Sequence, residues 1–442
     1  MPAAPADSAL YRDLFGDAET AALFSDSAEL RAMLIVEGAL AKVQGGLGLI
    51  PADAAAFLHR ASLEVQLDPA ALAAETARNG VPVPALVAAF RKVAEAPDMT
   101  RWVHWGATSQ DIMDTALALR LKRLLALWDA RLGALVGALG RLAEDEADTA
   151  MAGRTYGQAA VPTSFGALVA GWGRPLMRHR ARLAALAPGL LQVSLSGAAG
   201  TSVALGPQAA AVRAGLASAL GLKDPGASWH AERDGFGALA GWMAGVTASL
   251  GKLGEDVITL TQTGIAEVTI SGAGGSSTMP QKQNPVGPSV LVALARQTGA
   301  LASVVQGAGV HRLQRDGAAW FSEWLTLPQM CVSTGRALAL ASDLTARLRP
   351  DPAAMARGLD EGQGTLMAEA LTFALAEHLP RPEAAAHVAA LCREALASGT
   401  PLVTLAARDY PGTDWAARLS GPGTLGDAPA EARAFARAAR GG

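Results

Sequence analysis

A stretch without proline from Ser109 to about Ala150 limits the possible folds of this chain more than any other feature. At about 1.5 Å per residue, a helix over this stretch would be on the order of 60 Å long. Helices of this length are typical of coiled coils and large bundles. Four further long helices are predicted, over residues 165–187, 236–264, 285–310 and 322–348. The sequence therefore predicts an all-α protein.

Composition supports this fold class and limits the expected partners. The 442 residues are rich in Ala, Leu and Gly and only 5% aromatic, which favours helices over a β-sandwich. A formal net charge of -3 gives no reason to expect nucleic acid or an acidic membrane surface as a partner. Because one chain cannot bury five long apolar stripes by itself, we expect a homo-oligomer.

Compartment and cofactors are predicted from cysteines, histidines and glycine patterns. The two cysteines, Cys331 and Cys392, form no CxxC pair, which fits a reducing compartment. Residues 1–12 lack a basic-then-apolar secretion signal, and the apolar run at 236–250 is too short to span a bilayer. No metal-binding histidine spacing and no phosphate-binding glycine loop occur. We expect a soluble, cytoplasmic protein without a metal or another cofactor.

The segment from Gly274 to Pro285 carries the strongest functional signal. It reads Gly-Gly-Ser-Ser-Thr-Met-Pro-Gln-Lys-Gln-Asn-Pro. The first four residues alone would be a flexible linker, but the Met-Pro-x-Lys-x-Asn-Pro part has no such explanation. Pro285 is predicted as the first helical residue after an N-cap at Asn284, and a helix start favours anions. A serine here can exchange a proton next to a carboxylate that Lys282 and Asn284 would hold.

Two other polar segments lie next to long helices. The segment His104–Asp111 has more hydrogen-bonding groups than a helix cap needs, although Thr108 or Ser109 is expected to cap the helix. The segment Gly153–Gln158 contains Arg154 and Tyr156, and its simpler interpretation is a loop and a cap.

Two further clusters, 229–234 with His230 and Arg233 and 311–316 with Arg315, are typical of solvated ion pairs as often as of binding sites. The aromatic residues Trp320, Phe321 and Trp324 that follow are expected to be core or wall residues.

Three of these segments, 104–111, 153–158 and 274–285, lie in this order between long helices. In this arrangement the chain resembles the fumarase/aspartase superfamily over nearly its whole length. The stretch from Gly275 to Pro285 matches the signature of that superfamily closely. The resemblance implies three helical domains, which we place at 1–103, 104–349 and 350–442, with a catalytic loop at 271–288. It also implies a homotetramer in which three subunits contribute to each active site.

The resemblance assigns roles to individual residues. The proton-carrying serine of the family falls on Ser276, and the lysine and asparagine that hold the substrate carboxylate fall on Lys282 and Asn284. The family moves a proton at the carbon next to a carboxylate through a dianionic aci-carboxylate. That intermediate needs cations and donors directed at its doubled charge.

Two positions depart from the superfamily pattern together. Most relatives have a histidine where this chain has Tyr156, and a glutamate seven residues after the signature lysine, where this chain has Ser289. Fumarase, argininosuccinate lyase and adenylosuccinate lyase rely on that histidine. The branch without it consists of the 3-carboxy-cis,cis-muconate cycloisomerases of the bacterial protocatechuate (β-ketoadipate) pathway, which segments 104–111 and 229–234 resemble in particular.

The branch implies an intramolecular lyase that closes a tricarboxylate diene to 4-carboxymuconolactone. An internal carboxylate would add to the alkene, and Ser276 would protonate the resulting aci-carboxylate. The residues expected to hold the substrate are His104, Thr108, Ser109, Arg154, Tyr156, His230, Arg233, Lys282, Asn284 and Arg315.

Two alternatives stay open. The first is another fumarate-releasing lyase of the superfamily, similar to adenylosuccinate lyase, in which Tyr156 would replace the missing acid. The aromatic residues after Asp316 offer no grip for its nucleotide phosphate. The second is a non-catalytic helical scaffold, against which the intact serine loop argues.

Overall fold

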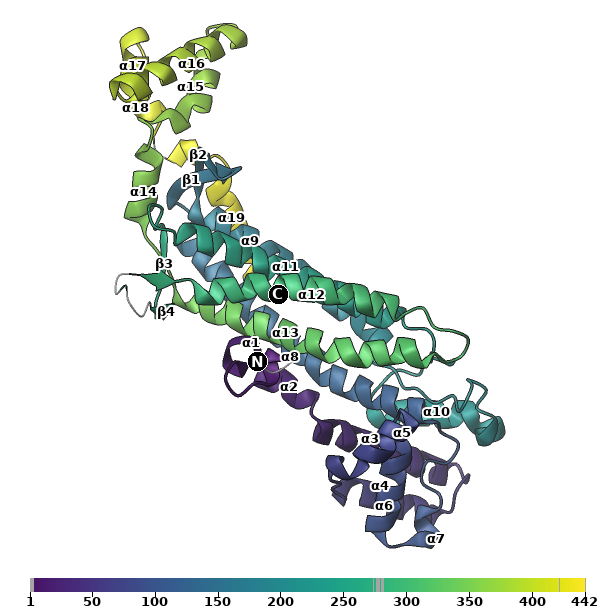
Figure 1. Cartoon of the computed structure of the whole chain (residues 1–442). Helices are drawn as coiled ribbons and strands as arrows, with labels where there is room; N and C mark the ends of the chain where they lie inside the picture. Colours follow the sequence, from purple (N-terminus) through teal and green to yellow (C-terminus); the bar gives the residue numbers. More distant parts are fainter. Residues whose placement is uncertain (1–3, 273, 276–278, 280–281, 421, 442) are drawn as a thin grey trace. The chain divides into compact units, whose positions relative to one another are not determined.

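The computed structural model describes residues 4–272, 274–275, 279, 282–420 and 422–441, and most of them are helical (Figure 1). The five predicted long spans form helices of at least 22 residues: α8 (Ser109–Asp145), α9 (Phe165–Leu190), α11 (Asp234–Leu260), α12 (Val286–Gly307) and α13 (Gly317–Arg347). The predicted all-α fold class is confirmed.

The chain forms two compact units. The first comprises Met1–Ala130, His179–Ala248 and Leu294–Ala337, and the second comprises Arg131–Arg178, Ser249–Ala293 and Leu338–Gly442. Every boundary falls inside a long helix, so each long helix contributes residues to both units. The division into three domains at 104 and 350 stays a prediction.

Besides its parts of the five long helices, the first unit contains further helices. They are η1 (Pro5–Asp7), α1 (Arg12–Phe15), α2 (Ala18–Leu23), α3 (Asp26–Gly46), α4 (Ala52–Glu64), η2 (Pro69–Leu72), α5 (Ala73–Asn79), α6 (Val83–Ala94), α7 (Pro97–Thr100), η3 (Val203–Gln208) and α10 (Ala209–Leu220). In the core of this unit, Trp128 of α8 stacks on Trp242 of α11 with ring centroids 5.3 Å apart. Buried aromatic pairs of this kind hold the long helices in register.

The second unit contains three short antiparallel strand pairs. They are β1 (Ala150–Thr155) with β2 (Gln158–Ser164), β3 (Val268–Ile270) with β6 (Leu348–Pro350), and β4 (Gly274–Gly275) with β5 (Gln283–Asn284). The sequence did not predict these strands. The β1–β2 hairpin replaces the loop expected at 153–158, because Tyr156 and Gly157 take left-handed φ values of 53° and 76°. Two consecutive left-handed residues form the tight turn that suits a hairpin.

The tail of the second unit consists of shorter helices. The described residues contain α14 (Pro352–Asp360), η4 (Thr365–Met367), α15 (Ala368–Leu375), α16 (Arg381–Ser398), α17 (Leu402–Asp409), α18 (Trp415–Arg418), η5 (Pro422–Leu425) and α19 (Ala428–Arg440). Pro380 and Pro401 precede α16 and α17, and Gly399 ends α16 with a φ of 71°. Proline and left-handed glycine both stop helices, so the tail breaks into short pieces.

Candidate active site

The segment before α8 is a tight turn that presents His104. His104 itself has a φ of 62°, a strained value for a residue other than glycine. Two side chains of α3 hold it there. Glu37 Oε1 lies 2.6 Å from His104 Nδ1, and Glu37 Oε2 accepts a hydrogen bond of 3.1 Å from the His104 backbone N–H. Two turns further along α3, Gln44 Nε2 donates to the carbonyl oxygen of Trp105 at 2.7 Å.

The surroundings of His104 favour its charged form. Burial lowers the pKa of His104, but the charge and hydrogen bond of Glu37 and the charge of Asp111 together raise it by more. Arg91 opposes them, and the net pKa lies above the ordinary value of 6.5. His104 therefore stays an imidazolium over a wider pH range than a free histidine, beside a helix start that also favours anions.

Asp111 organises the start of α8. The helix begins at Ser109, and the backbone N–H of Thr108 donates to Asp111 Oδ2 at 3.0 Å, which is half of a capping box. The buried Asp111 carboxylate also accepts from the backbone N–H groups of Ser196 and Gly197 at 2.9 Å each. Asp111 thus ties the 196–197 loop to the helix start.

Asp111 also holds the side chain of His230. His230 Nε2 lies 2.8 Å from Asp111 Oδ1, and both side chains are buried. The other ring nitrogen, Nδ1, has no hydrogen-bond partner among the described residues. The bond to Asp111 fixes the orientation of the His230 ring.

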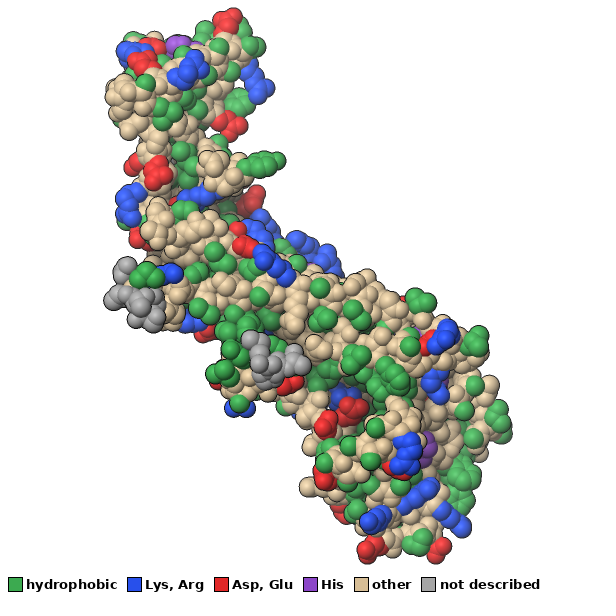
Figure 2. All heavy atoms as spheres, viewed as in Figure 1, with side chains coloured by type: hydrophobic (Ala, Val, Ile, Leu, Met, Phe, Trp, Pro, Cys, Tyr) green, Lys and Arg blue, Asp and Glu red, His purple; other side chains and the backbone are tan. Residues whose placement is uncertain are grey.

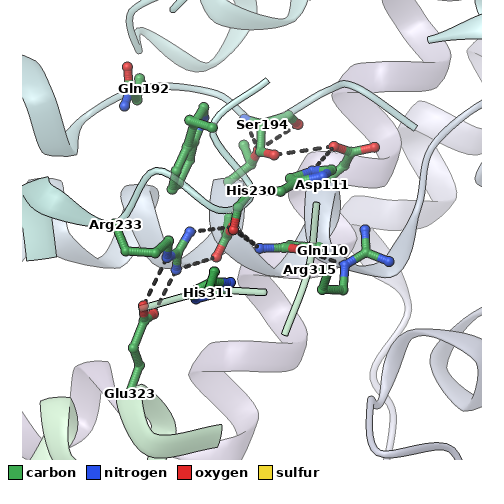
Figure 3. A network of polar contacts seen from close by, with 12 residues as sticks. Gln110, Asp111, Gln192, Ser194, His230, Arg233, His311, Arg315 and Glu323 are labelled. Atoms are coloured by element: carbon green, nitrogen blue, oxygen red, sulfur yellow. Dashed lines mark hydrogen bonds and ion pairs between the residues drawn. The ribbon is translucent and has the colours of Figure 1, made fainter. Parts of the chain in front are cut away.

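Arg233 lies between two buried carboxylates in the same unit (Figure 3). Arg233 Nη1 donates to Asp114 Oδ2 at 2.8 Å, and its Nε and Nη2 donate to Glu323 at 2.9 and 2.7 Å. Burial opposes the charge of Arg233, but the two carboxylates outweigh it and raise the pKa of the guanidinium. Burial raises the pKa of Glu323, although Arg233 partly offsets this effect. Direct substrate binding by Arg233 stays a prediction, and its guanidinium is already ion-paired on two sides.

Gln110 joins these groups to the exposed Arg315. Gln110 Nε2 donates to Asp114 Oδ2 at 3.1 Å and to the carbonyl oxygen of His230 at 3.0 Å. Gln110 Oε1 accepts from Arg315 Nε at 2.6 Å, a contact visible in Figure 3. The nearby His311 has a lowered pKa, because it is partly buried and faces the positive charge of Arg233. It is therefore neutral at pH 7.

The structure brings together six of the predicted site residues in the first unit: His104, Thr108, Ser109, His230, Arg233 and Arg315. Arg154, Tyr156, Lys282 and Asn284 belong to the second unit. Ser276, the predicted proton carrier, lies outside the described residues.

Arg154 and Tyr156 lie on the β1–β2 hairpin. Arg154 donates two hydrogen bonds of 2.8 Å to the buried carboxylate of Glu267, which raise the pKa of Arg154. The Tyr156 side chain is fully exposed at the tip of the hairpin. Like Arg233, Arg154 is therefore engaged by a carboxylate of its own unit.

Lys282 and Asn284 lie just before α12. Lys282 is exposed and its backbone N–H donates to the carbonyl oxygen of Met279 at 3.0 Å, while Asn284 pairs with Gly274 across β4 and β5. The helix begins at Val286, one residue later than predicted, because Asn284 belongs to a strand and not to the cap.

Several buried acids that hold predicted site residues of their own unit were not themselves predicted: Glu37, Asp111, Asp114 and Glu323 in the first unit and Glu267 in the second. Glu37 interrupts the apolar run from Met33 to Leu40, and all but one residue of that run is buried. A charged residue on a buried helical face requires a partner. That rule would have singled out Glu37, although not its partner.

Comparison with known proteins places this geometry in a family. The profile of a lyase family matches residues 13–298. A 3-carboxy-cis,cis-muconate cycloisomerase of Pseudomonas aeruginosa is 42% identical over 388 residues, 87% of this chain and 84% of that protein. A nitrosuccinate lyase of Streptomyces davaonensis is 36% identical over 413 residues, which are 90% of this chain and 87% of that protein.

Among solved structures, the crystal structure of the 3-carboxy-cis,cis-muconate lactonizing enzyme of Pseudomonas putida superimposes with a TM-score of 0.92. Its sequence is 35% identical, and the superimposed region covers 98% of this chain and 99% of the chain in that structure. The chain belongs to this lyase family, the fumarase/aspartase superfamily that its three polar segments resemble.

Proposed function

We propose that the chain is a cycloisomerase that converts 3-carboxy-cis,cis-muconate to 4-carboxymuconolactone in the breakdown of aromatic compounds through protocatechuate. The similarity to the Pseudomonas cycloisomerases over nearly the full length of both chains carries this proposal. The family histidine and glutamate are absent here, and Tyr156 and Ser289 occupy their positions. These two side chains cannot form the charged acid–base pair of an eliminating lyase.

In the proposed reaction, one carboxylate oxygen of the substrate bonds to an alkene carbon of the same molecule. The electron pair of the alkene moves onto a second carboxylate, which becomes the aci-carboxylate. Ser276 then gives a proton to the carbon next to that carboxylate, and water restores the serine. The fully protonated acids of substrate and product are isomers, so with ionised carboxylates the reaction takes up one proton from solvent and needs no other reactant. The attacking group is part of the substrate and therefore needs positioning rather than activation.

The groups around the start of α8 suit the binding of the substrate carboxylates. The His104 imidazolium, the free end of α8 at Thr108 and Ser109, and the exposed Arg315 favour carboxylates. Lys282 and Asn284 would bind the carboxylate that becomes the aci-carboxylate, as the family resemblance implies.

An ultraviolet assay tests the proposed function. We expect the absorbance of the conjugated diene of 3-carboxy-cis,cis-muconate to fall in the presence of the protein, because lactonisation removes one of the two conjugated double bonds. Identification of the lactone by proton NMR completes the test. An unchanged diene spectrum with folded protein would contradict the proposal.

We also propose a soluble, cytoplasmic homotetramer. Helix α12 is long and apolar enough to cross a membrane by length and composition, a test that the core helices of soluble proteins also pass. In Figure 2 the surface over α12 carries few charged side chains. The exposed small or apolar residues on this helix include Ala293, Gly299, Ala300, Ser303 and Val304. Association of such faces between subunits would bury them.

Sedimentation equilibrium checks the tetramer. We expect a mass four times that of one chain, and we expect Ala300→Glu on the exposed face of α12 to shift the mass toward smaller species. A monomeric mass of the unaltered protein would overturn the tetramer but not the proposed reaction in itself.

The similarity to nitrosuccinate lyase supports a second candidate, the release of an unsaturated dicarboxylate from a succinyl adduct. Tyr156 would then have to replace the missing histidine. The ultraviolet absorbance of released fumarate, followed over a set of succinyl adducts, distinguishes the two candidates. Turnover of an adduct without closure of the muconate would favour the second.

A further inference from the structure

We propose that Glu37 of α3 is a positioning residue that keeps His104 as a cationic hydrogen-bond donor for a carboxylate of the substrate. This inference rests on the proposed function for the identity of the ligand. The contact between Glu37 and His104 is independent of it.

The packing of α3 explains how Glu37 keeps its place. Gly38 and Gly45 lie seven residues apart on α3 and face α4. A Cβ atom at Gly38 would lie 1.8 Å from Ser62 Oγ, and a Cβ atom at Gly45 would lie 2.2 Å from Ala55 Cβ. This close approach fixes α3 against α4. Glu37 and Gln44, also seven residues apart, form the adjacent stripe and reach the 104–105 turn. Residues seven apart share a helix face, so one rigid helix anchors the turn at two points.

Glu37 engages both the backbone and the ring of His104. Its carboxylate accepts from the backbone N–H of His104 while it contacts Nδ1, and only 3% of Glu37 is exposed. The two contacts fix the strained backbone and the ring plane together. The side chain of His104 is 22% exposed, and no hydrogen bond of its Nε2 to a described residue is observed. Nε2 is therefore the atom through which His104 can meet a ligand.

The charge of the ring decides what Nε2 can do. With Nδ1–H donated to Glu37, a neutral ring has a lone pair at Nε2, which repels a carboxylate. A protonated ring has an N–H at Nε2, which donates to a carboxylate. Protonation thus converts the exposed atom of His104 from an acceptor to a charged donor.

Three charged groups act on His104 from the elements packed around it. Glu37 on α3 and Asp111 on α8 are negative, and Arg91 on α6 is positive. Burial of the ring favours its neutral form, and Glu37 provides the largest opposing effect. Without the charge of Glu37, the ring would lose its proton at a lower pH.

The variant Glu37→Gln tests this inference, because glutamine retains hydrogen-bonding groups of similar shape without the charge. We expect the alkaline limb of the kcat/KM profile to move to lower pH. At pH 8 we expect kcat/KM to fall about tenfold, mostly through KM, and at pH 5 to stay within about twofold of the unaltered protein. Glu37→Asp retains the charge and is expected to return the limb toward its original position.

A matched control is Gln44→Met, which removes the bond to Trp105 and leaves the charges around His104 in place. It is expected to lower activity by the same factor at every pH. A uniform loss of activity in Glu37→Gln, with the limb unmoved, would reduce Glu37 to a structural role and overturn the inference.

NMR titration of the His104 ring without substrate separates this inference from the proposed function. We expect the midpoint to fall in Glu37→Gln and to stay in place in Gln44→Met. An unchanged midpoint in Glu37→Gln overturns the coupling whatever the substrate is. A shifted midpoint in a protein that does not convert the muconate confirms the coupling and contradicts the proposed reaction instead.

Discussion

Replacement of Ser276 by alanine is expected to lower kcat by about 10²–10⁴-fold, because the aci-carboxylate then has no placed proton donor. Binding of the tricarboxylate should persist, since the cationic and amide groups predicted to hold it are unchanged. Stopped-flow absorbance of the diene measures the chemical step, and calorimetry with the lactone product measures binding. A variant with both kcat and binding intact would remove Ser276 from the reaction.

Ser289, in the first turn of α12 just after this segment, provides a matched control. Its hydroxyl group is exposed and donates to the carbonyl oxygen of Pro285 at 2.9 Å, so its side chain already has a local partner just before α12. We expect Ser289→Ala to retain kcat within about twofold. A large loss in this variant would mean that a hydroxyl group here takes over part of the role of the missing family glutamate.

The long helices could be predicted because their signals are local. Between Ser109 and Asp145 no proline interrupts the chain, and helix formation over such a span depends on neighbours three and four residues apart. The β1–β2 hairpin could not be predicted in the same way. Its turn places Tyr156, a residue without a preference for left-handed backbone, at a φ of 53°, and the pairing of β1 with β2 on either side holds it there.

The candidate site was predictable in part for a similar reason. Its motifs contain the residues with free polar groups, such as His104 and Arg315, and these can be found in the sequence. The acids that orient them are far away along the chain. Glu37 is 67 residues from His104, and Glu323 is 90 residues from Arg233. No spacing rule connects such pairs, because only the packed helices bring them together.

The buried acids around Arg233 lead to the largest expected effect on stability. Arg233→Met retains much of the side-chain volume but removes the charge, and Asp114 and Glu323 then face each other in the core. Removal of one partner from a buried ion pair costs about 3–5 kcal/mol. We expect the free energy of unfolding at pH 7, measured with urea, to fall by about that amount.

The pH dependence and a second substitution test the cause of this loss. Without Arg233, burial would raise the pKa of Glu323 further above its value in the unfolded chain, so the folded form would bind more protons. The stability of the variant should therefore improve as the pH falls from 7 to 5, and Glu323→Gln added to Arg233→Met should restore part of it at pH 7. Arg312→Gln, which removes an exposed arginine paired with Asp316, is the control and should cost much less, because Asp316 retains the backbone N–H groups of Ala318 and Ala319 as donors. If Arg233→Met were as stable as the unaltered protein at pH 7, the two carboxylates would not depend on the guanidinium, and Arg233 would be available to bind substrate directly.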